Sequence, residues 1–426
     1  MNEDWVETTI SNIFETVTGN TPPKADKDNY GNEIPFIKPP QIFNNTISSS
    51  IEFLSIRGAA KSRILPINSV LVTCIGNLGR VSINKVEVAF NQQINAIKPI
   101  EQIDPKFTFY QAQSINFRNQ LESLSTSTTV ALVNKSSFNS IKFKIASLSI
   151  QKAIVRKIEE LFSSLDSGIA DLKKAQEQLV IYRQAVLKKA FEGEFEKVKL
   201  EDVSTAMGGF AFKSTSFIKE IGKYQVVRIG NVRPGLIRYD ASPVYLNDVE
   251  TKVLQNYLLK KGDVIITLTG TRKKRDYGFT TVIKDENLLL NQRLAFLRFN
   301  SDFLPKFFLY FSWSEPFKVQ FFGSETGNVG QGNVGMKAVR ETLVPFISLE
   351  EQKKIVREIE SRLSVCDKVE ENIAESLEKA KALRQSILKK AFEGKLLSSA
   401  EIARCKKDQD YEPAGVLLER IKKEKK

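Results

Sequence analysis

Cationic side chains, rather than catalytic groups, give this sequence its clearest chemical signal. Residues 272–275 read Arg-Lys-Lys-Arg and stand between Thr271 and Tyr277. Lysines can neutralise backbone phosphates, and an arginine can donate two hydrogen bonds to the O6 and N7 atoms of a guanine. We therefore interpret this run as a loop that lies along DNA. A solvated basic turn is the alternative that the run by itself leaves open.

Familiar catalytic patterns are missing from the sequence. The chain has no histidine, which excludes a Ser-His-Asp triad, a histidine general base and a histidine-containing zinc site. Its three cysteines, Cys74, Cys366 and Cys405, are far apart and form no Cys-x-x-Cys pair. The P-loop pattern Gly-x-x-x-x-Gly-Lys-Ser/Thr does not occur either. We expect no catalytic residue and no metal site in this chain.

The net charge of the chain is +13, and its distribution is uneven. Residues 195–347 hold 22 basic and 15 acidic side chains, a net charge of +7. This excess favours a polyanionic partner that is held mainly by that segment. No apolar run is long enough to span a bilayer, and the first residues lack a signal-peptide pattern, so we expect a soluble, cytoplasmic protein with no membrane partner.

A duplicated segment must position the basic loop. Residues 151–193 match residues 352–394 without a gap. Apolar residues recur every seven positions, which is typical of a coiled-coil seam. Each copy is expected to form one helix of about 65 Å, at about 1.5 Å per residue. The predicted seam residues are Ile154, Ile158, Leu161, Leu165, Leu172, Leu179 and Val186 in the first copy, and Ile355, Ile359, Val369, Ile373, Leu383 and Ile387 in the second.

The segments that precede the two helices are also distant copies of each other. The pattern Pro-Lys-Phe-x-x-Tyr occurs at residues 105–110 and again at residues 305–310. Short β-branched runs at residues 69–73 and 263–267 predict strands. Asp104, directly before a proline, predicts the start of a helix. Each preceding segment is therefore expected to be a mixed α/β domain.

The predicted fold class is α+β, with two mixed α/β domains separated by two long helices that form an antiparallel coiled coil, and with an internal pseudo-two-fold repeat. The antiparallel order is expected because the second helix must return the chain that the first helix carried away. The predicted segments are the first domain at residues 1–148, the first helix at 149–194, the second domain at 195–347, the second helix at 348–394 and the C-terminal tail at 395–426.

We predict DNA contacts for loop residues of both domains. In the first domain these are Gly19, Asn20, Thr21, Lys38, Gly76, Asn77, Arg80, Asn91, Gln92 and Gln93. In the second domain they are Arg228, Asn231, Thr271, Arg272, Lys273, Lys274, Arg275, Asn291, Gln292, Arg293, Gln331 and Asn333. The largest local difference between the copies is the basic run, where the first copy has only a tight turn at residues 76–80.

The order of domain, helix, domain and helix resembles the specificity subunit of Type I restriction-modification enzymes. The resemblance includes the helix openings at residues 151–155 and 351–356 and the two Ala-Phe-Glu-Gly helix ends. It extends to Thr-Gly-Asn-Thr-Pro-Pro at residues 18–23, Gly-Gln-Gly-Asn at 330–333 and the tail at 412–421. The family's usual Pro-Leu-Pro-Pro-Leu-x-Glu-Gln lead-in is altered before both helices, which leaves the start of the first helix open.

This resemblance implies a non-catalytic subunit that recognises a bipartite, asymmetric site in double-stranded DNA through two target recognition domains. It implies methyltransferase subunits, expected to be two, and restriction subunits as partners. S-adenosylmethionine would bind the methyltransferase partner, and Mg²⁺ and ATP the restriction partner, with no cofactor on this chain. Two alternatives stay open: a coiled-coil scaffold without sequence-specific DNA reading, and a self-contained nuclease or methylase.

Overall fold

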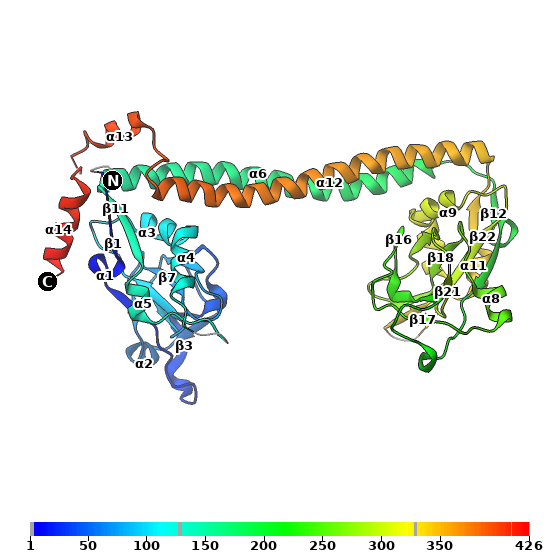
Figure 1. Ribbon diagram of the computed structural model, residues 1–426, viewed down its shortest axis with the longest axis horizontal. Helices are drawn as coiled ribbons and strands as arrows, with labels where there is room; N and C mark the ends of the chain where they lie inside the picture. The colour runs from blue at the N-terminus through cyan, green and yellow to red at the C-terminus, as the bar shows by residue number, and fades with distance from the viewer. Residues whose placement is uncertain (1–3, 127–129, 328–329, 410, 426) are drawn as a thin grey trace. The chain divides into compact units, whose positions relative to one another are not determined.

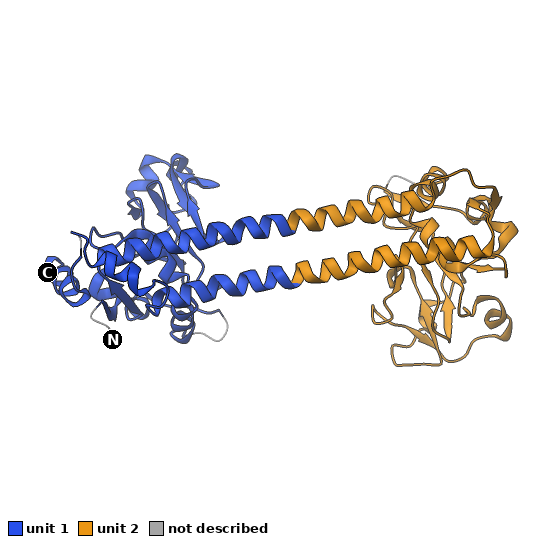
Figure 2. Cartoon of the chain, turned by 90° about the horizontal axis from the view of Figure 1, so that it is seen from above, with its two compact units in different colours: residues 1–172, 375–426 blue, residues 173–374 orange. Residues whose placement is uncertain are grey.

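The computed structural model describes residues 4–126, 130–327, 330–409 and 411–425. The chain divides into two compact units, the first made of residues 1–172 and 375–426 and the second of residues 173–374 (Figure 2). Two long helices, α6 (Leu148–Ala190) and α12 (Leu349–Phe392), pass from one unit into the other (Figure 1). Each unit therefore contains one globular domain, part of α6 and part of α12.

The domain of the first unit is built on two sheets. One has the strand order β2 (Thr16–Thr18), β10 (Ile94–Ile97), β7 (Val70–Thr73), β8 (Val81–Asn84) and β4 (Asn45–Ile47). The other has the order β5 (Glu52–Leu54), β3 (Tyr30–Ile37), β9 (Val88–Phe90) and β6 (Ile64–Leu65). A separate antiparallel pair joins β1 (Trp5–Thr9) to β11 (Lys142–Ala146), the strand that leads into α6.

The helices of this domain are α1 (Ile10–Ile13), α2 (Ile56–Ala60), α3 (Pro105–Ala112), α4 (Ile115–Ser123) and α5 (Lys135–Asn139), with 3-10 turns η1 (Lys27–Asn29) and η2 (Pro39–Gln41). The carboxylate of Asp104 accepts hydrogen bonds from the backbone N–H groups of Lys106 and Phe107. It thereby satisfies two donors that a helix start leaves without partners, which confirms the predicted beginning of α3.

The domain of the second unit has the same kind of sheets. One has the order β13 (Ser204–Gly208), β22 (Leu294–Phe299), β18 (Val264–Thr267) and β20 (Thr280–Val282). Another has the order β17 (Tyr245–Leu246), β14 (Tyr224–Val227) and β21 (Leu288–Leu290). The strand pairs are β12 (Lys197–Lys199) with β24 (Leu343–Pro345), β15 (Val232–Arg233) with β16 (Leu236–Ile237), and β19 (Thr269–Thr271) with β23 (Gln331–Asn333).

Its helices are α7 (Leu200–Val203), α8 (Thr251–Tyr257), α9 (Pro305–Ser312), α10 (Glu315–Gly323) and α11 (Met336–Glu341), with 3-10 turns η3 (Ser214–Ser216) and η4 (Ile229–Asn231). The two domains repeat one topology. The antiparallel pair β7 and β10 corresponds to β18 and β22, and the parallel pair β3 and β9 corresponds to β14 and β21. The predicted internal repeat of mixed α/β domains is therefore confirmed.

The helices α6 and α12 are antiparallel partners in both units. In the first unit the guanidinium of Arg384, near the end of α12, pairs with Asp166 and lies 4.5 Å from the centroid of the Phe162 ring. In the second unit Arg183, near the end of α6, lies 2.7 Å from Asp367 and 2.8 Å from Glu370. The end of each helix thus meets an earlier part of the other, as predicted.

A single apolar row of α12 forms the centre of this seam. Its members are at most 7% exposed, and they are Ile359, Cys366, Ile373, Ala380 and Ile387. On α6, Ile154, Ile158 and Val186 are buried, and Leu161, Leu165, Leu172 and Leu179 are half-buried, as is Ile355 of α12. Val369 and Leu383 are 38% and 50% exposed, so our prediction of them as seam residues is wrong. They lie on the row beside the buried one, at the edge of the helix pair.

The C-terminal tail completes the core of the first unit. Two short helices, α13 (Ser399–Cys405) and α14 (Ala414–Glu424), follow α12. Leu417, Leu418 and Ile421 of α14 belong to the same buried cluster as Ile10 of α1 and Ile145 of β11. Because apolar side chains of the tail are part of this core, removal of the tail would expose their partners in the core to water.

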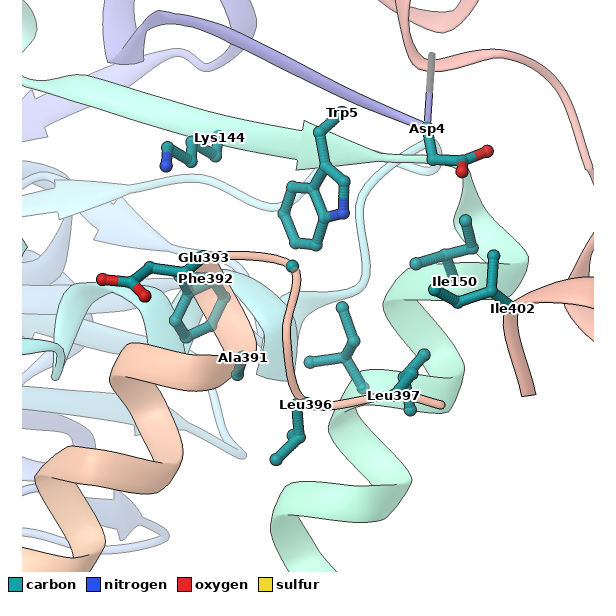
Figure 3. Close-up of a pocket in the computed structure, with 12 residues that line it drawn as sticks. Asp4, Trp5, Lys144, Ile150, Ala391, Phe392, Glu393, Leu396, Leu397 and Ile402 are labelled. Carbon is teal, nitrogen blue, oxygen red and sulfur yellow. The ribbon is translucent and has the colours of Figure 1, made fainter. Parts of the chain in front are cut away.

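A buried carboxylate ties the tail to the first strand. Asp4 is 2% exposed, accepts a hydrogen bond from the Tyr411 hydroxyl at 2.9 Å and pairs with the Lys406 ammonium at 2.8 Å. Beside it, a cavity of about 170 Å³ is lined by residues from the first strand, the start of α6, the end of α12 and the tail (Figure 3). Three segments that are distant in the sequence, residues 4–5, 144–154 and 391–402, therefore meet at this point.

Candidate DNA-binding surface

Four chain segments of the second unit converge beside its larger sheet. The backbone N–H of Gly209 donates to the carbonyl of Leu294 at 2.8 Å. The N–H of Leu268 donates to the carbonyl of Arg293 at 2.9 Å, and the N–H of Val334 donates to the carbonyl of Leu268 at 2.9 Å. The segments around residues 209, 268, 293 and 334 are thereby fixed against one another.

The first unit repeats this arrangement bond for bond. The N–H of Gly19 donates to the carbonyl of Ile94 at 3.1 Å, and the N–H of Cys74 donates to that of Gln93 at 2.9 Å. The N–H of Val133 in turn donates to the carbonyl of Cys74 at 2.9 Å. The same frame therefore presents a different set of loop side chains in each domain.

Two residues that we predicted to contact DNA, Gly19 and Asn91, make close contacts that hold the converged segments together. A Cβ atom on Gly19 would lie 2.2 Å from the carbonyl oxygen of Asn91, and one on Gly209 would lie 2.0 Å from that of Asn291. Glycine is required at both positions because any side chain would collide with the backbone. Asn91 is only 8% exposed and donates from its side-chain amide to Gln93. Gly19 and Asn91 thus position the loops.

A groove of about 650 Å³ opens between the converged segments of the second unit. Three predicted residues line it: Thr271, Arg293 and Gln331. Thr271 and Gln331 are direct partners in the β19 and β23 pair, and Arg293 has a φ of +71° in the turn before β22. Arg233 of β15 also lines the groove, and our sequence-based prediction missed it because β15 has no counterpart in the duplicated motifs.

The basic run is anchored at both ends. The Nε of Arg272 donates to Glu325 at 2.9 Å, and the Arg275 guanidinium lies 4.8 Å from the centroid of the Phe322 ring. Arg272 is thus paired within the second domain, and its contact with DNA stays a prediction. Lys273 and Lys274 are exposed and make no ion pair within the described part of the chain, so they are the cations available for phosphates.

Glu325 is the residue that anchors Arg272. It accepts a hydrogen bond from the Tyr277 hydroxyl as well as from Arg272, and these bonds hold the pKa of Glu325 below its ordinary value. Burial, with the neighbouring carboxylate, raises the pKa of Tyr277. At neutral pH the Glu325 carboxyl is therefore deprotonated and accepts the hydrogen bond, and the Tyr277 hydroxyl is protonated and donates it. These hydrogen bonds fix the backbone on which the two lysines stand.

In the first unit the corresponding surface is polar and weakly charged. Asn77 and Gln92 are exposed, and the Thr21 hydroxyl donates to the Gln92 side chain at 2.7 Å. The Arg80 guanidinium lies 5.2 Å from the centroid of the Phe43 ring, which is itself 61% exposed. Phe43 was not predicted, since a single aromatic residue in a loop carries no sequence signal.

Several other residues that we predicted to contact DNA make hydrogen bonds, an ion pair or a strand pairing within their own domain. The amide of Asn20 holds the backbone of Lys61 and Arg63, at 2.8 and 2.9 Å. Asn231, 3% exposed, donates to the carbonyls of Arg238 and Ala241 and accepts from the Arg228 N–H. Lys38 pairs with Glu52, the Arg228 guanidinium donates to the Ser242 carbonyl, and Asn333 pairs with Thr269 across β19 and β23. Gly76 and Gln292 are exposed, whereas Gln93 and Asn291 are half-buried.

The described residues contain no group of three or more histidine, cysteine, aspartate or glutamate side chains that could hold a metal ion. Among the same residues, no helix has both the length and the apolar composition that crossing a membrane requires.

Comparison with known proteins places the chain in a family. The family described as the Type I restriction modification DNA specificity domain matches residues 2–177 and again residues 192–379. The chain belongs to this family and is a specificity subunit of a Type I restriction-modification system, the subunit that recognises DNA and does not itself catalyse a reaction. Membership of the family implies DNA and the other subunits of such a system as partners.

Named relatives and solved structures agree with this assignment. The chain is 25% identical to the EcoKI specificity subunit of Escherichia coli K12, over 99% of this chain and 96% of the relative. It is 24% identical to the MjaVIII specificity subunit of Methanocaldococcus jannaschii, over 91% and 92% of the two chains. Nothing in these comparisons supports a coiled-coil scaffold without sequence-specific DNA reading.

The fold is also that of solved specificity subunits. The crystal structure of the HsdS subunit from Thermoanaerobacter tengcongensis superposes with a TM-score of 0.61 at 18% identity, over 93% of this chain and 98% of that one. A chain from a structural study of type I R-M complex assembly gives a TM-score of 0.72 at 18% identity, over 92% and 98% of the two chains.

Proposed function

We propose that the two globular domains, residues 1–148 and 195–347, are target recognition domains that each read one half of a bipartite, asymmetric site in double-stranded DNA. The observation that carries the proposal is the repeated convergence of four loops, with one backbone frame and two different sets of side chains. Because both domains share the backbone hydrogen bonds but present different loop side chains, each domain can recognise a different half-site. The helices at 149–194 and 348–394 then hold a fixed spacing between the half-sites.

The proposed complex also contains two methyltransferase subunits and restriction subunits. The duplication supports two methyltransferases, because equivalent surfaces of a repeat can bind equivalent partners. S-adenosylmethionine is then bound by the methyltransferase subunits, and Mg²⁺ and ATP by the restriction subunits. The chain works in the cytoplasm, where its DNA target lies.

Methylation mapping tests this function. DNA from cells that carry the chain and its methyltransferase partner is expected to be methylated at one bipartite sequence with a fixed spacer. Deletion of the chain is expected to abolish that methylation. Methylation without a bipartite site, or methylation that persists after the deletion, would contradict the proposed role.

The basic loop provides a narrower prediction. Replacement of Lys273 and Lys274 by alanine is expected to weaken binding of the methyltransferase complex to all DNA, because two phosphate contacts are lost. The slope of log K against log salt is expected to fall by about two units, at about 0.9 per phosphate contact. The ratio of target to competitor affinity should stay nearly constant, since phosphate contacts carry no sequence information.

The matched control replaces Lys260 and Lys261, which precede β18, at the opposite end of this strand from the basic loop. Alanine at these two positions removes the same charge and should leave the salt slope unchanged. Equal slopes for the two double variants would show that Lys273 and Lys274 do not face DNA.

A further inference from the structure

A buried glutamine at the start of α6 joins the long helix to the domain of the first unit. Gln151 is fully buried, and its side-chain oxygen accepts a hydrogen bond from the Asp104 N–H at 2.9 Å. Its amide nitrogen donates to the carbonyls of Ala146 at 2.8 Å and Gln102 at 3.4 Å. One side chain thus connects the first turn of α6, the strand before it and the start of α3.

The second unit contains the same arrangement. Gln352 of α12 is fully buried and accepts a hydrogen bond from the Leu304 N–H at 2.7 Å. Its amide nitrogen donates to the carbonyls of Asp302 at 2.9 Å and Ile347 at 3.0 Å. The bonds connect the first turn of α12, the segment before it and the start of α9, which is the repeat counterpart of α3.

A glutamate further along each helix makes a second connection. In the first unit Glu159 of α6 accepts hydrogen bonds from the Lys106 ammonium and, at 3.5 Å, from the Tyr110 hydroxyl. In the second unit Glu360 of α12 accepts from the Lys306 ammonium at 2.6 Å and from the Tyr310 hydroxyl at 3.3 Å. All four donors come from the two Pro-Lys-Phe-x-x-Tyr motifs.

The tyrosines stay protonated as donors. Burial, together with the neighbouring glutamate, raises the pKa of Tyr110 and of Tyr310 to about 12. Gln151 and Glu159 are eight positions apart, which is about 12 Å along the helix at about 1.5 Å per residue. Two connections at this separation restrain α3 from pivoting on α6, which a single connection would not do.

The ion pairs of Glu159 and Glu360 orient the domains on the helices more than they stabilise the fold. Lys106 and Glu159 are 44% and 40% exposed, and Lys306 and Glu360 are 53% and 37% exposed. Solvent screens ion pairs at such exposure, so each adds little to the stability of the fold. Both copies nevertheless keep the same pair and the same tyrosine, although the loops of the two domains differ. A shared orientation of domain and helix explains why both copies retain them.

We propose that Gln151 with Glu159, and Gln352 with Glu360, are positioning residues that set the angle between each recognition domain and its long helix. Through this angle they determine which spacer between the two DNA half-sites the chain accepts. The inference rests on the proposed function, since the spacer has meaning only if both domains read DNA.

The test uses the full chain in complex with its methyltransferase partner and the double variant Glu159→Ala, Glu360→Ala. Methylation is measured on duplexes with the mapped spacer and with spacers one base pair shorter and longer. We expect kcat/KM for the mapped spacer relative to the altered spacers to fall roughly tenfold, which corresponds to about 1.4 kcal/mol. A loosened domain can follow the displaced half-site, whereas a fixed domain cannot. Discrimination against a mutated half-site should stay unchanged.

The matched control is the double variant Glu160→Ala, Glu358→Ala. These glutamates lie beside the positioning pair on the same helices, but they pair within their own helix, with Lys157 and Arg362. The control should keep the spacer selectivity of the native chain. Glu159→Gln with Glu360→Gln retains the hydrogen-bond acceptors and should recover part of that selectivity, which a loss of fold would not allow.

A second variant tests the buried connection. Gln352→Met has a similar volume and removes three hydrogen bonds, and it should broaden spacer selectivity in the same direction. Thermal unfolding shows whether each variant is folded. Folded variants with unchanged spacer selectivity, or with equal losses of spacer and half-site selectivity, would overturn the inference. If the native chain itself shows no bipartite preference, the proposed function fails and the inference fails with it.

Discussion

A shortened chain in which residue 193 is joined directly to residue 395 is expected to form a two-fold dimer that marks an inverted-repeat DNA site. Such a chain keeps the first domain, α6 and the tail. In the intact protein the end of α12 contributes Ile387, Leu388 and Ala391 to the core of the first unit. The end of α6 has Val186, Leu187 and Ala190 at the matching positions of the repeat. A second copy of α6 can therefore replace α12.

The shortened chain must keep the C-terminal tail, residues 395–426, to fold. Leu417 and Leu418 lie in the first core, and the buried Asp4 carboxylate depends on Tyr411 and Lys406. In the dimer, each tail would follow the α6 of one copy and pack on the domain of the other. The chain that ends at residue 193 lacks these groups, and it leaves the apolar partners of Leu417 and Leu418 in the first core open to water. It is expected to aggregate.

Sedimentation measures the association of the shortened chain, and methylation mapping with the methyltransferase partner identifies its target. The expected target is one half-site of the intact protein repeated in inverted orientation, because identical domains related by a two-fold axis read identical sequences. A monomer would contradict the prediction, and so would a dimer that still marks an asymmetric site. Either result would mean that the two halves are not interchangeable.

Lengthening both long helices by one heptad is expected to lengthen the DNA spacer without changing the half-sites. Seven residues are inserted near residue 175 of α6 and seven near residue 375 of α12. The pairs of Arg384 with Asp166 and of Arg183 with Glu370 indicate that these positions lie at the same level of the seam. A heptad adds about 10 Å of helix at about 1.5 Å per residue, or about three base pairs at about 3.4 Å each.

Methylation of the original site is expected to fall toward the non-specific level, by about 10³-fold. A site with the longer spacer should be methylated in its place. A second variant with four residues inserted into α6 alone lengthens this helix by about 5.4 Å, which is one or two base pairs at about 3.4 Å each. It should lengthen the spacer by that smaller step, with the seam locally unwound at the insertion. An unchanged spacer, or altered half-sites, in the heptad variant would show that the helices do not set the distance.

The sequence alone was sufficient for the features that depend on local periodicity. The duplicated heptads predicted both long helices, and Ile158 of α6 and Ile359 and Ile373 of α12 are buried. Asp104 before a proline predicted the start of α3, because a capping group acts on its own first turn. The repeat also predicted two domains of one topology, and with the helices it indicated the family.

Only the tertiary structure decided how residues far apart in the chain are used. The basic run carries no sign that Arg272 pairs with Glu325, which lies 53 positions away in the chain. Asn231 looked like a loop residue, but the carbonyls of Arg238 and Ala241 enclose its amide.

Val369 follows the heptad pattern yet stays exposed, because a pair of helices buries only the row that faces the partner. The tail carries no sign in its sequence that it completes the first core. Such contacts depend on which segments the fold brings together, and a pattern of neighbouring residues does not contain that information.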